Sequence, residues 1–193
     1  MDDKYMTKDQ LIAELVELRQ RIAQLETMEA KLRAMSTTDD LTGLFNRRGF
    51  FSIAPKQLRL CCRNDRNATI IYADVDGLKK INDSLGHLEG DNALKDVAEI
   101  IRETFRESDI VARMGGDEFV ILMPETSESN AENVINRLQQ NIKNNKGRKR
   151  NYGLSMSVGL AYYDSQKPCS IDELLSQADK SMYVQKKQLK MIT

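Results

Sequence analysis

The segment Ala68–Asp76, which reads ATIIYADVD, carries the clearest structural signal in the sequence. Its apolar run is rich in β-branched residues and ends in acids, which predicts a buried strand. On either side, helical spacing of apolar side chains alternates with short apolar runs. We therefore expect helices over 46–63, 91–106 and 128–143, and strands over 110–114, 118–123 and 154–163.

The order strand–helix–strand–strand–helix–strand predicts an α+β fold of the ferredoxin-like or palm type. We expect an antiparallel sheet with helices packed on one of its faces. Its first strand should be central and should lie next to 110–114, the strand that enters the hairpin. A capping box, Ser170-x-x-Glu173, indicates where a last helix begins.

Residues 8–35 contain neither glycine nor proline, which predicts one long helix. Its apolar residues follow a heptad seam, with Leu11, Leu18, Leu25 and Leu32 at d and Leu15, Ile22 and Glu29 at a. The seam favours a parallel coiled-coil homodimer, with packing of the helix on its own domain as the alternative. We expect an N-terminal coiled-coil signalling helix over 1–36 and a globular domain over 37–193.

The composition narrows the possible chemistry. Lys and Arg number 29, as do Asp and Glu, so the net charge is zero and no overall field favours nucleic acid or an anionic membrane. The charged N-terminus and the lack of a long apolar run predict neither a secretory signal nor a membrane segment. Three cysteines without a CxxC pair favour a cytoplasmic setting. The single histidine, His87, excludes multi-histidine metal sites.

Acidic residues gather where the predicted strands end. Asp74 and Asp76 close the first strand, and Asp117 and Glu118 lie at the turn between the next two. Neighbouring carboxylates raise one another's pKa unless a cation neutralises them. Ligands that are all oxygen suit Mg²⁺ or Mn²⁺, and such an ion commonly handles nucleoside triphosphates. The alternative is that these acids are solvated turn residues.

Three longer segments favour the metal site over that alternative. They read RMGGDEF at 113–119, DVDGLKKINDSLGHLEGD at 74–91 and DDLTGLFNRRGF at 39–50. Together they resemble the GGDEF family, the bacterial diguanylate cyclases, from about Asp39 to Lys190. The resemblance implies a nucleotidyltransferase that joins two GTP molecules into cyclic di-GMP and releases pyrophosphate. It also implies a dimer that holds one GTP per subunit.

The resemblance implies roles for the acids. Asp74 and the Val75 carbonyl match metal ligands of the family. Asp117 matches a residue that binds metal and helps to deprotonate the attacking 3′-hydroxyl, and Glu118 matches the ligand of a second ion. Lys79 matches a lysine that neutralises the phosphate in the transition state; without the resemblance it would be read as a surface lysine.

Other residues match the nucleotide-binding positions of the family. Asn82, His87 and Asp91 correspond to the guanine side, which predicts a preference for GTP over ATP. Helix capping is the alternative role of Asn82 and Asp91. Lys186 matches a contact to the triphosphate, whereas Lys190 stands where the family usually has arginine. The glycine common in that stretch is also missing, which allows the last helix to continue.

A product-inhibition site is the last expectation from the resemblance. Arg106-x-x-Asp109 precedes Gly115 by the family's spacing, and Arg137 matches a further arginine of that site. An exposed ion pair at a helix end is the alternative reading of this pattern. Two other functions stay open: a catalytically idle receptor for cyclic di-GMP, and a coiled-coil signalling adaptor whose globular part binds a protein partner.

Overall fold

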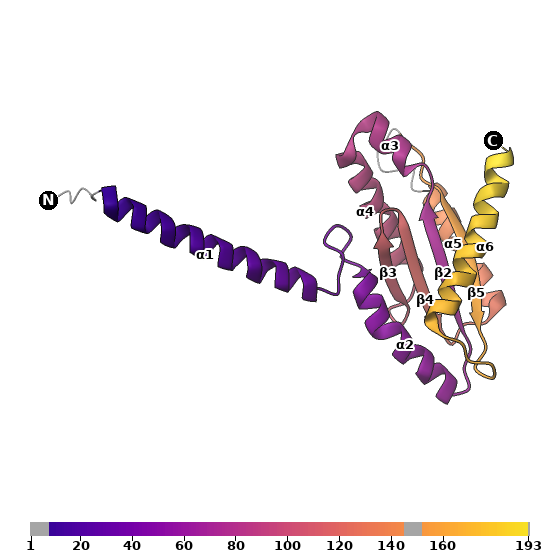
Figure 1. Ribbon diagram of the computed structural model, residues 1–193. Coiled ribbons are helices and arrows are strands. Elements are labelled where there is room, and N and C mark those ends of the chain that lie inside the picture. Colours follow the sequence, from indigo (N-terminus) through magenta and orange to yellow (C-terminus); the bar gives the residue numbers. More distant parts are fainter. Residues whose placement is uncertain (1–7, 145–151, 193) are drawn as a thin grey trace. The chain divides into compact units, whose positions relative to one another are not determined.

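A computed structural model describes residues 8–144 and 152–192 (Figure 1). The chain divides into two units, residues 1–36 and 37–193. In the described part of the first unit, α1 (Lys8–Met35) confirms the predicted helix. Apolar side chains of its seam from Leu11 to Leu25 are about half exposed. The coiled-coil pairing of this helix stays a prediction.

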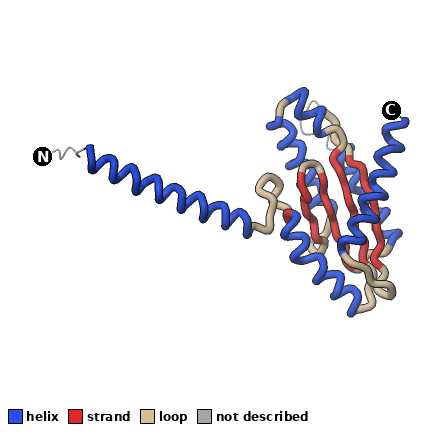
Figure 2. The backbone as a smooth tube through the Cα atoms, in the orientation of Figure 1, coloured by secondary structure: helices blue, strands red, loops and turns tan. Residues whose placement is uncertain are grey.

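The second unit is built on a five-stranded sheet with the order β1-β3-β4-β2-β5. Only β1 and β3 pair in parallel; the other neighbours are antiparallel. Figure 2 shows helices flanking this sheet. The strands are β1 (Phe45–Asn46), β2 (Ala68–Val75), β3 (Ile110–Gly115), β4 (Glu118–Pro124) and β5 (Met156–Tyr163). The helices are α2 (Arg47–Arg63), α3 (Leu78–Leu85), α4 (His87–Thr104), α5 (Glu128–Asn144) and α6 (Ile171–Ile192).

The α+β fold and the succession of its main elements are confirmed, but the neighbour predicted for the first strand is wrong. Strand β2 lies between β4 and β5, and not beside β3. The crossover through α3 and α4 returns the chain parallel to β2, so direct pairing of β2 with β3 would be parallel. The hairpin instead places its antiparallel return strand, β4, against β2.

Helices cover both faces of the sheet, so the expectation of one covered face is also wrong. On one face Ile70 of β2 shares a core with Leu174 of α6. On the other face Ile71 packs in a core with Ile101 of α4 and Leu138 of α5. Seven of the eight β2 residues are buried. An uninterrupted apolar strand is typical of burial on both faces, so the sequence did carry this signal.

One short strand and one short helix were not predicted from the sequence, and one predicted helix begins at a different residue. Strand β1 has two residues, and α3 has eight, enclosed by Gly77 and Gly86 with φ of 74° and 89°. Helix α4 begins at His87, four residues before its predicted start. The predicted capping box of α6 is confirmed, since Ser170 and Glu173 exchange hydrogen bonds of 3.2 Å. Within the described residues, no helix is both long and apolar enough to cross a membrane.

Helix α6 approaches β5 most closely at Gly159. A Cβ atom at this position would lie 2.1 Å from both the Ala178 carbonyl oxygen and the Met182 nitrogen. These are backbone atoms of the helix, so no side-chain rotation relieves the overlap. The lack of a side chain at Gly159 therefore fixes how closely the helix lies against the sheet.

We expect Gly159→Ala to lower the free energy of unfolding by about 2 kcal/mol, because α6 must move away from β5. Urea denaturation of the variant measures this loss. Gly153→Ala is the matched control, since a Cβ there meets no atom within 4 Å. Equal stability of the two variants would contradict the close packing at Gly159.

Candidate active site

The predicted acids lie at one end of the β2–β4 pair. Asp74 is the cross-strand partner of Glu118. The Val75 N–H donates a 3.0 Å hydrogen bond to the Asp117 carbonyl oxygen, which joins the end of β2 to the hairpin turn. The pairing of β2 with β4 thus brings together acidic residues that are more than forty positions apart in the sequence.

Asp74 is a buried carboxylate whose charge is paired with Lys186. The residue is 7% exposed, and Lys186 Nζ lies 2.5 Å from Asp74 Oδ1. Burial raises the pKa of Asp74, and the charges of Asp117 and Asp76 raise it further. The hydrogen bond and the charge of Lys186 oppose this rise without cancelling it. The site therefore carries more negative charge than one ammonium group neutralises.

Asp76 has a structural role beside this site. Ser157 Oγ donates to Asp76 Oδ1 at 2.6 Å, and Ser155 Oγ donates to Asp76 Oδ2 at 3.0 Å. The Asp76 N–H also donates to the Ser155 carbonyl oxygen at 2.9 Å. These bonds hold the start of β5 against the end of β2.

Glu118 lies on the same face of the sheet as Tyr72. Burial raises the pKa of Tyr72 well above its usual value, and the carboxylate of Glu118 adds to the rise. The sequence offered no signal for this pair beyond the alternation along the strand.

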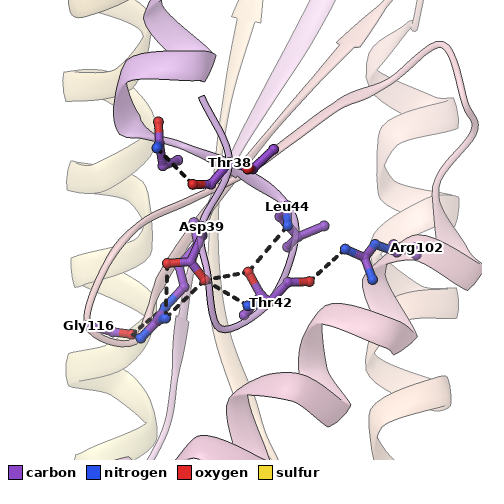
Figure 3. A network of polar contacts seen from close by, with 8 residues as sticks. Thr38, Asp39, Thr42, Leu44, Arg102 and Gly116 are labelled. Atoms are coloured by element: carbon purple, nitrogen blue, oxygen red, sulfur yellow. Dashed lines mark hydrogen bonds and ion pairs between the residues drawn. The ribbon is translucent and has the colours of Figure 1, made fainter. Parts of the chain in front are cut away.

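The hairpin between β3 and β4 is held by a polar network drawn in Figure 3. Gly116 adopts φ of 53°, and its carbonyl oxygen accepts hydrogen bonds from Arg113 Nη2 at 2.7 Å and Nε at 3.0 Å. Arg113 Nη1 also binds Asp39, at 3.1 Å from Oδ1. The arginine thereby ties the turn that carries Asp117 to the segment that precedes β1.

Asp39 is in turn fixed by its own loop. Its Oδ1 accepts hydrogen bonds from Thr42 N at 2.9 Å and from Thr42 Oγ1 at 2.7 Å. Burial alone would raise the pKa of Asp39, but the Thr42 and Arg113 hydrogen bonds outweigh it and lower the pKa. Arg102 Nη2 donates to the Thr42 carbonyl at 2.6 Å and joins α4 to the loop. Asp39 and Arg113 both lie in motifs that resemble the family, but the sequence predicted no role for either residue.

The guanine-side candidates lie on α3 and the first turns of α4. Asn82 is half-buried, and His87 and Asp91 are exposed. A Cβ atom at position 90 would lie 1.8 Å from Asn82 Oδ1, so the glycine at this position lets Asn82 lie against α4. Gly90 was not singled out from the sequence, although a glycine inside a helix indicates a close approach.

The three candidate lysines differ in their surroundings. Lys79, on α3, is exposed, and Lys186 is bound to Asp74. The side chain of Lys190 lies outside the described residues. Helix α6 continues to Ile192, as expected from the missing glycine.

Arg106, Asp109 and Arg137 line a single cleft, together with residues of β4 and α5. Asp109 Oδ2 accepts a 2.9 Å hydrogen bond from the Arg106 N–H, and Arg137 Nη2 donates to the Thr104 carbonyl oxygen. Burial raises the pKa of Asp109, against the backbone hydrogen bond and the nearby charges of Arg106 and Arg137. The fold thus brings the guanidinium group of Arg137, on α5, near Arg106 and Asp109, which lie in the turn before β3.

The donor set at the end of β2 fits a hard divalent cation in charge and in ligand type. Asp74, Asp117 and Glu118 supply only oxygen ligands, and burial penalises the uncompensated charge on Asp74. Within residues 8–144 and 152–192 no three acidic, histidine or cysteine side chains already converge on one point. This arrangement suits Mg²⁺, which is commonly held by one or two carboxylates together with substrate phosphates.

The sequence-family model described as "Diguanylate cyclase, GGDEF domain" matches residues 36–191. The chain therefore belongs to the diguanylate cyclase, GGDEF-domain family. The match includes the whole sheet, both helical layers and each candidate residue named above.

Two curated relatives come from Pseudomonas aeruginosa. The diguanylate cyclase TpbB is 36% identical over 179 residues, which are 90% of this chain and 40% of that protein. The cyclic di-GMP phosphodiesterase NbdA is 38% identical over 165 residues, which are 84% of this chain and 21% of NbdA. The chain thus spans less than half of the length of these relatives.

The fold also matches a solved structure. The coiled coil and GGDEF domain of DgcB from Caulobacter crescentus, solved with c-di-GMP, has a TM-score of 0.73 and 24% sequence identity. The match covers 92% of this chain and 95% of that one, and at this identity it establishes the fold.

Asp74→Asn should raise the melting temperature of the metal-free protein by roughly 2 °C, because it removes a buried charge next to two other acids. Asp76→Asn is the matched control and should lower it by roughly 2–4 °C, because its carboxylate accepts two serine hydrogen bonds. Differential scanning calorimetry without divalent ions measures both changes. A lower melting temperature for Asp74→Asn would mean that the Lys186 pair outweighs the burial cost.

Proposed function

We propose that this chain is a diguanylate cyclase that condenses two GTP molecules into cyclic di-GMP with release of pyrophosphate. One observation carries the proposal: buried Asp74 lies opposite Glu118 and beside the turn that contains Asp117. Membership in the family and the likeness to TpbB agree with this activity.

The acids at the end of β2 are proposed to hold Mg²⁺ or Mn²⁺. Asp74, the Val75 carbonyl and Asp117 would bind the first ion, and Glu118 a second. When bound, the metal lowers the pKa of the attacking 3′-hydroxyl and offsets charge that develops on the α-phosphate. Asp117 accepts the hydroxyl proton, and Lys79 neutralises the phosphate as the transition state forms.

Guanine is proposed to bind beside α3 and α4. A carboxylate such as that of Asp91 accepts from both the ring N–H and the amino group on the pairing edge of guanine. Adenine has an acceptor in place of that ring donor, so a carboxylate facing it would stay unpaired. Discrimination of this kind reaches about 10⁴–10⁵ at best, which supports a preference for GTP over ATP. Asn82 and His87 would contact the same base, and Lys186 and Lys190 the triphosphate.

Dimerisation through α1 would bring two such sites together. Each subunit holds one GTP, so the reaction needs two sites that face each other. A shared coiled coil makes the encounter intramolecular, with effective concentrations that reach about millimolar. The half-exposed apolar seam of α1 supports this role.

The cleft at Arg106, Asp109 and Arg137 is proposed to bind the product and to inhibit the enzyme. Arginine forks bind the O6/N7 edge of guanine or a phosphate, and a carboxylate accepts from the base donors. The convergence of the three side chains on one cleft supports this assignment.

The same cleft is the reason to keep a second candidate, a catalytically idle receptor for cyclic di-GMP. Incubation of the purified protein with GTP and Mg²⁺, followed by chromatography of the nucleotides, separates the two functions. Formation of cyclic di-GMP supports the cyclase. Tight binding of added cyclic di-GMP without turnover indicates the receptor. If the protein shows neither turnover nor binding, the coiled-coil adaptor is the remaining function.

Asp117→Ala should lower turnover by at least about 100-fold, because it removes a metal ligand and the proton acceptor. Binding of cyclic di-GMP at the Arg106 cleft should persist, which isothermal titration calorimetry measures. Asp172→Ala, an exposed acid in the first turn of α6, is the control that should retain activity. Loss of both turnover and product binding in Asp117→Ala would indicate a folding defect and not a catalytic one.

Arg106→Ala should relieve inhibition by accumulated product, so that progress curves with GTP stay linear for longer. Its initial rate should match that of the unmodified protein, because the residue lies outside the proposed catalytic site. Arg59→Ala on α2 serves as the control for removal of a surface arginine. If the progress curves of Arg106→Ala bend as early as those of the unmodified protein, this cleft does not mediate product inhibition.

A further inference from the structure

Lys186 binds the carboxylate that the proposed metal would need. Its Nζ lies 2.5 Å from Asp74 Oδ1, a distance that leaves no room for an ion between the two groups. The Asp74 side chain is 10% exposed and that of Lys186 is 29% exposed, so solvent screens this pair only in part. The same lysine is the candidate for contact with the triphosphate. It therefore has two possible anionic partners within one site.

The helix that carries Lys186 is fixed to the sheet in the turn that precedes the contact. Gln185 Oε1 accepts a 2.6 Å hydrogen bond from the Val158 N–H of β5. One turn earlier, Met182 lies directly over Gly159, where its Cα would be 2.7 Å from an added Cβ. Because the backbone of α6 is held in this way, the flexible side chain of Lys186 is the part that can exchange partners.

The ammonium group of Lys186 lies in the field of the carboxylates at the end of β2. Burial lowers the pKa of Lys186, but the hydrogen bond and charge of Asp74, together with the charges of Asp117 and Asp76, raise it overall. The lysine thus experiences the field of three carboxylates at the end of β2. Its single positive charge offsets only part of that field.

We propose that Lys186 is an internal counter-ion that competes with the divalent metal for Asp74 and is released to the triphosphate when metal and nucleotide bind together. This inference rests on the proposed function, since it takes Asp74 as a metal ligand. It adds that the nucleotide-free site is closed to the metal by a residue of the protein itself. Lys186 would then bind the nucleotide and also couple nucleotide binding to metal binding.

A thermodynamic consequence follows from this exchange. Metal alone must displace Lys186, so its apparent affinity is reduced by the fraction of molecules in which Asp74 is free. The triphosphate supplies another partner for the lysine and removes that penalty. Metal and nucleotide must therefore strengthen each other's binding by the same factor, because coupling between two ligands is reciprocal.

The test is titration of the full chain with Mn²⁺, with free Mn²⁺ measured by electron paramagnetic resonance. The variants compared are Lys186→Met, which keeps the aliphatic length, and Lys187→Met. Lys187 is the matched control, because its Nζ lies over the Tyr183 ring at 4.5 Å, away from Asp74. Each protein is titrated alone and with a GTP analogue that has a methylene bridge between its α- and β-phosphates.

Lys186→Met should bind Mn²⁺ alone at least about 5-fold more tightly than the unmodified protein, the lower end of typical coupling effects. The gain in Mn²⁺ affinity on adding the analogue should shrink in this variant and persist in Lys187→Met. Equal Mn²⁺ affinities of Lys186→Met and the unmodified protein would overturn the inference and leave the metal site intact. If an Asp74→Ala protein binds Mn²⁺ with the same affinity as the unmodified protein, Asp74 is not a metal ligand. That result would overturn both the metal site and the inference.

Discussion

The pairing of β2 with β4 determines where the acidic residues and the two cores of the domain lie. Its register places Asp74 opposite Glu118, and the Val75–Asp117 hydrogen bond continues the pair into the hairpin turn. Side chains alternate between the two faces of a strand, so a slip of one residue would turn Asp74 into the opposite core. Both cores of the domain share β2, and this two-sided burial opposes such a slip.

Polar bonds outside the sheet hold the ends of these strands. Arg113 joins the hairpin at Gly116 to Asp39, and Asp76 joins β2 to the start of β5. These bonds involve residues that do not themselves need to touch a substrate. They restrict the motion of the turn that carries Asp117, and such support for a site is what catalytic geometry requires.

The site combines residues with opposite requirements for stability and function. Asp74 is buried near other acids, and Lys186 reaches it from a helix 112 residues further along the chain. This carboxylate carries a charge that burial disfavours and that the Lys186 ion pair stabilises only in part. It is also the feature that would make a cation bind. The proposed exchange of Lys186 for a metal would link the two requirements, because the lysine offsets part of the negative charge until a ligand binds.

Local spacing and residue type were sufficient to predict the long helix, the main strands, the capping box at Ser170 and the acids at strand ends. The motifs of the sequence also determined the family. Two features became visible only in the folded domain: β4 lies beside β2, and Lys186 binds Asp74. These features depend on which distant segments pack together, and packing is set by shape and burial over the whole domain. Gly159 illustrates the difference, since a lone glycine in a strand predicts a close approach but does not say which helix makes it.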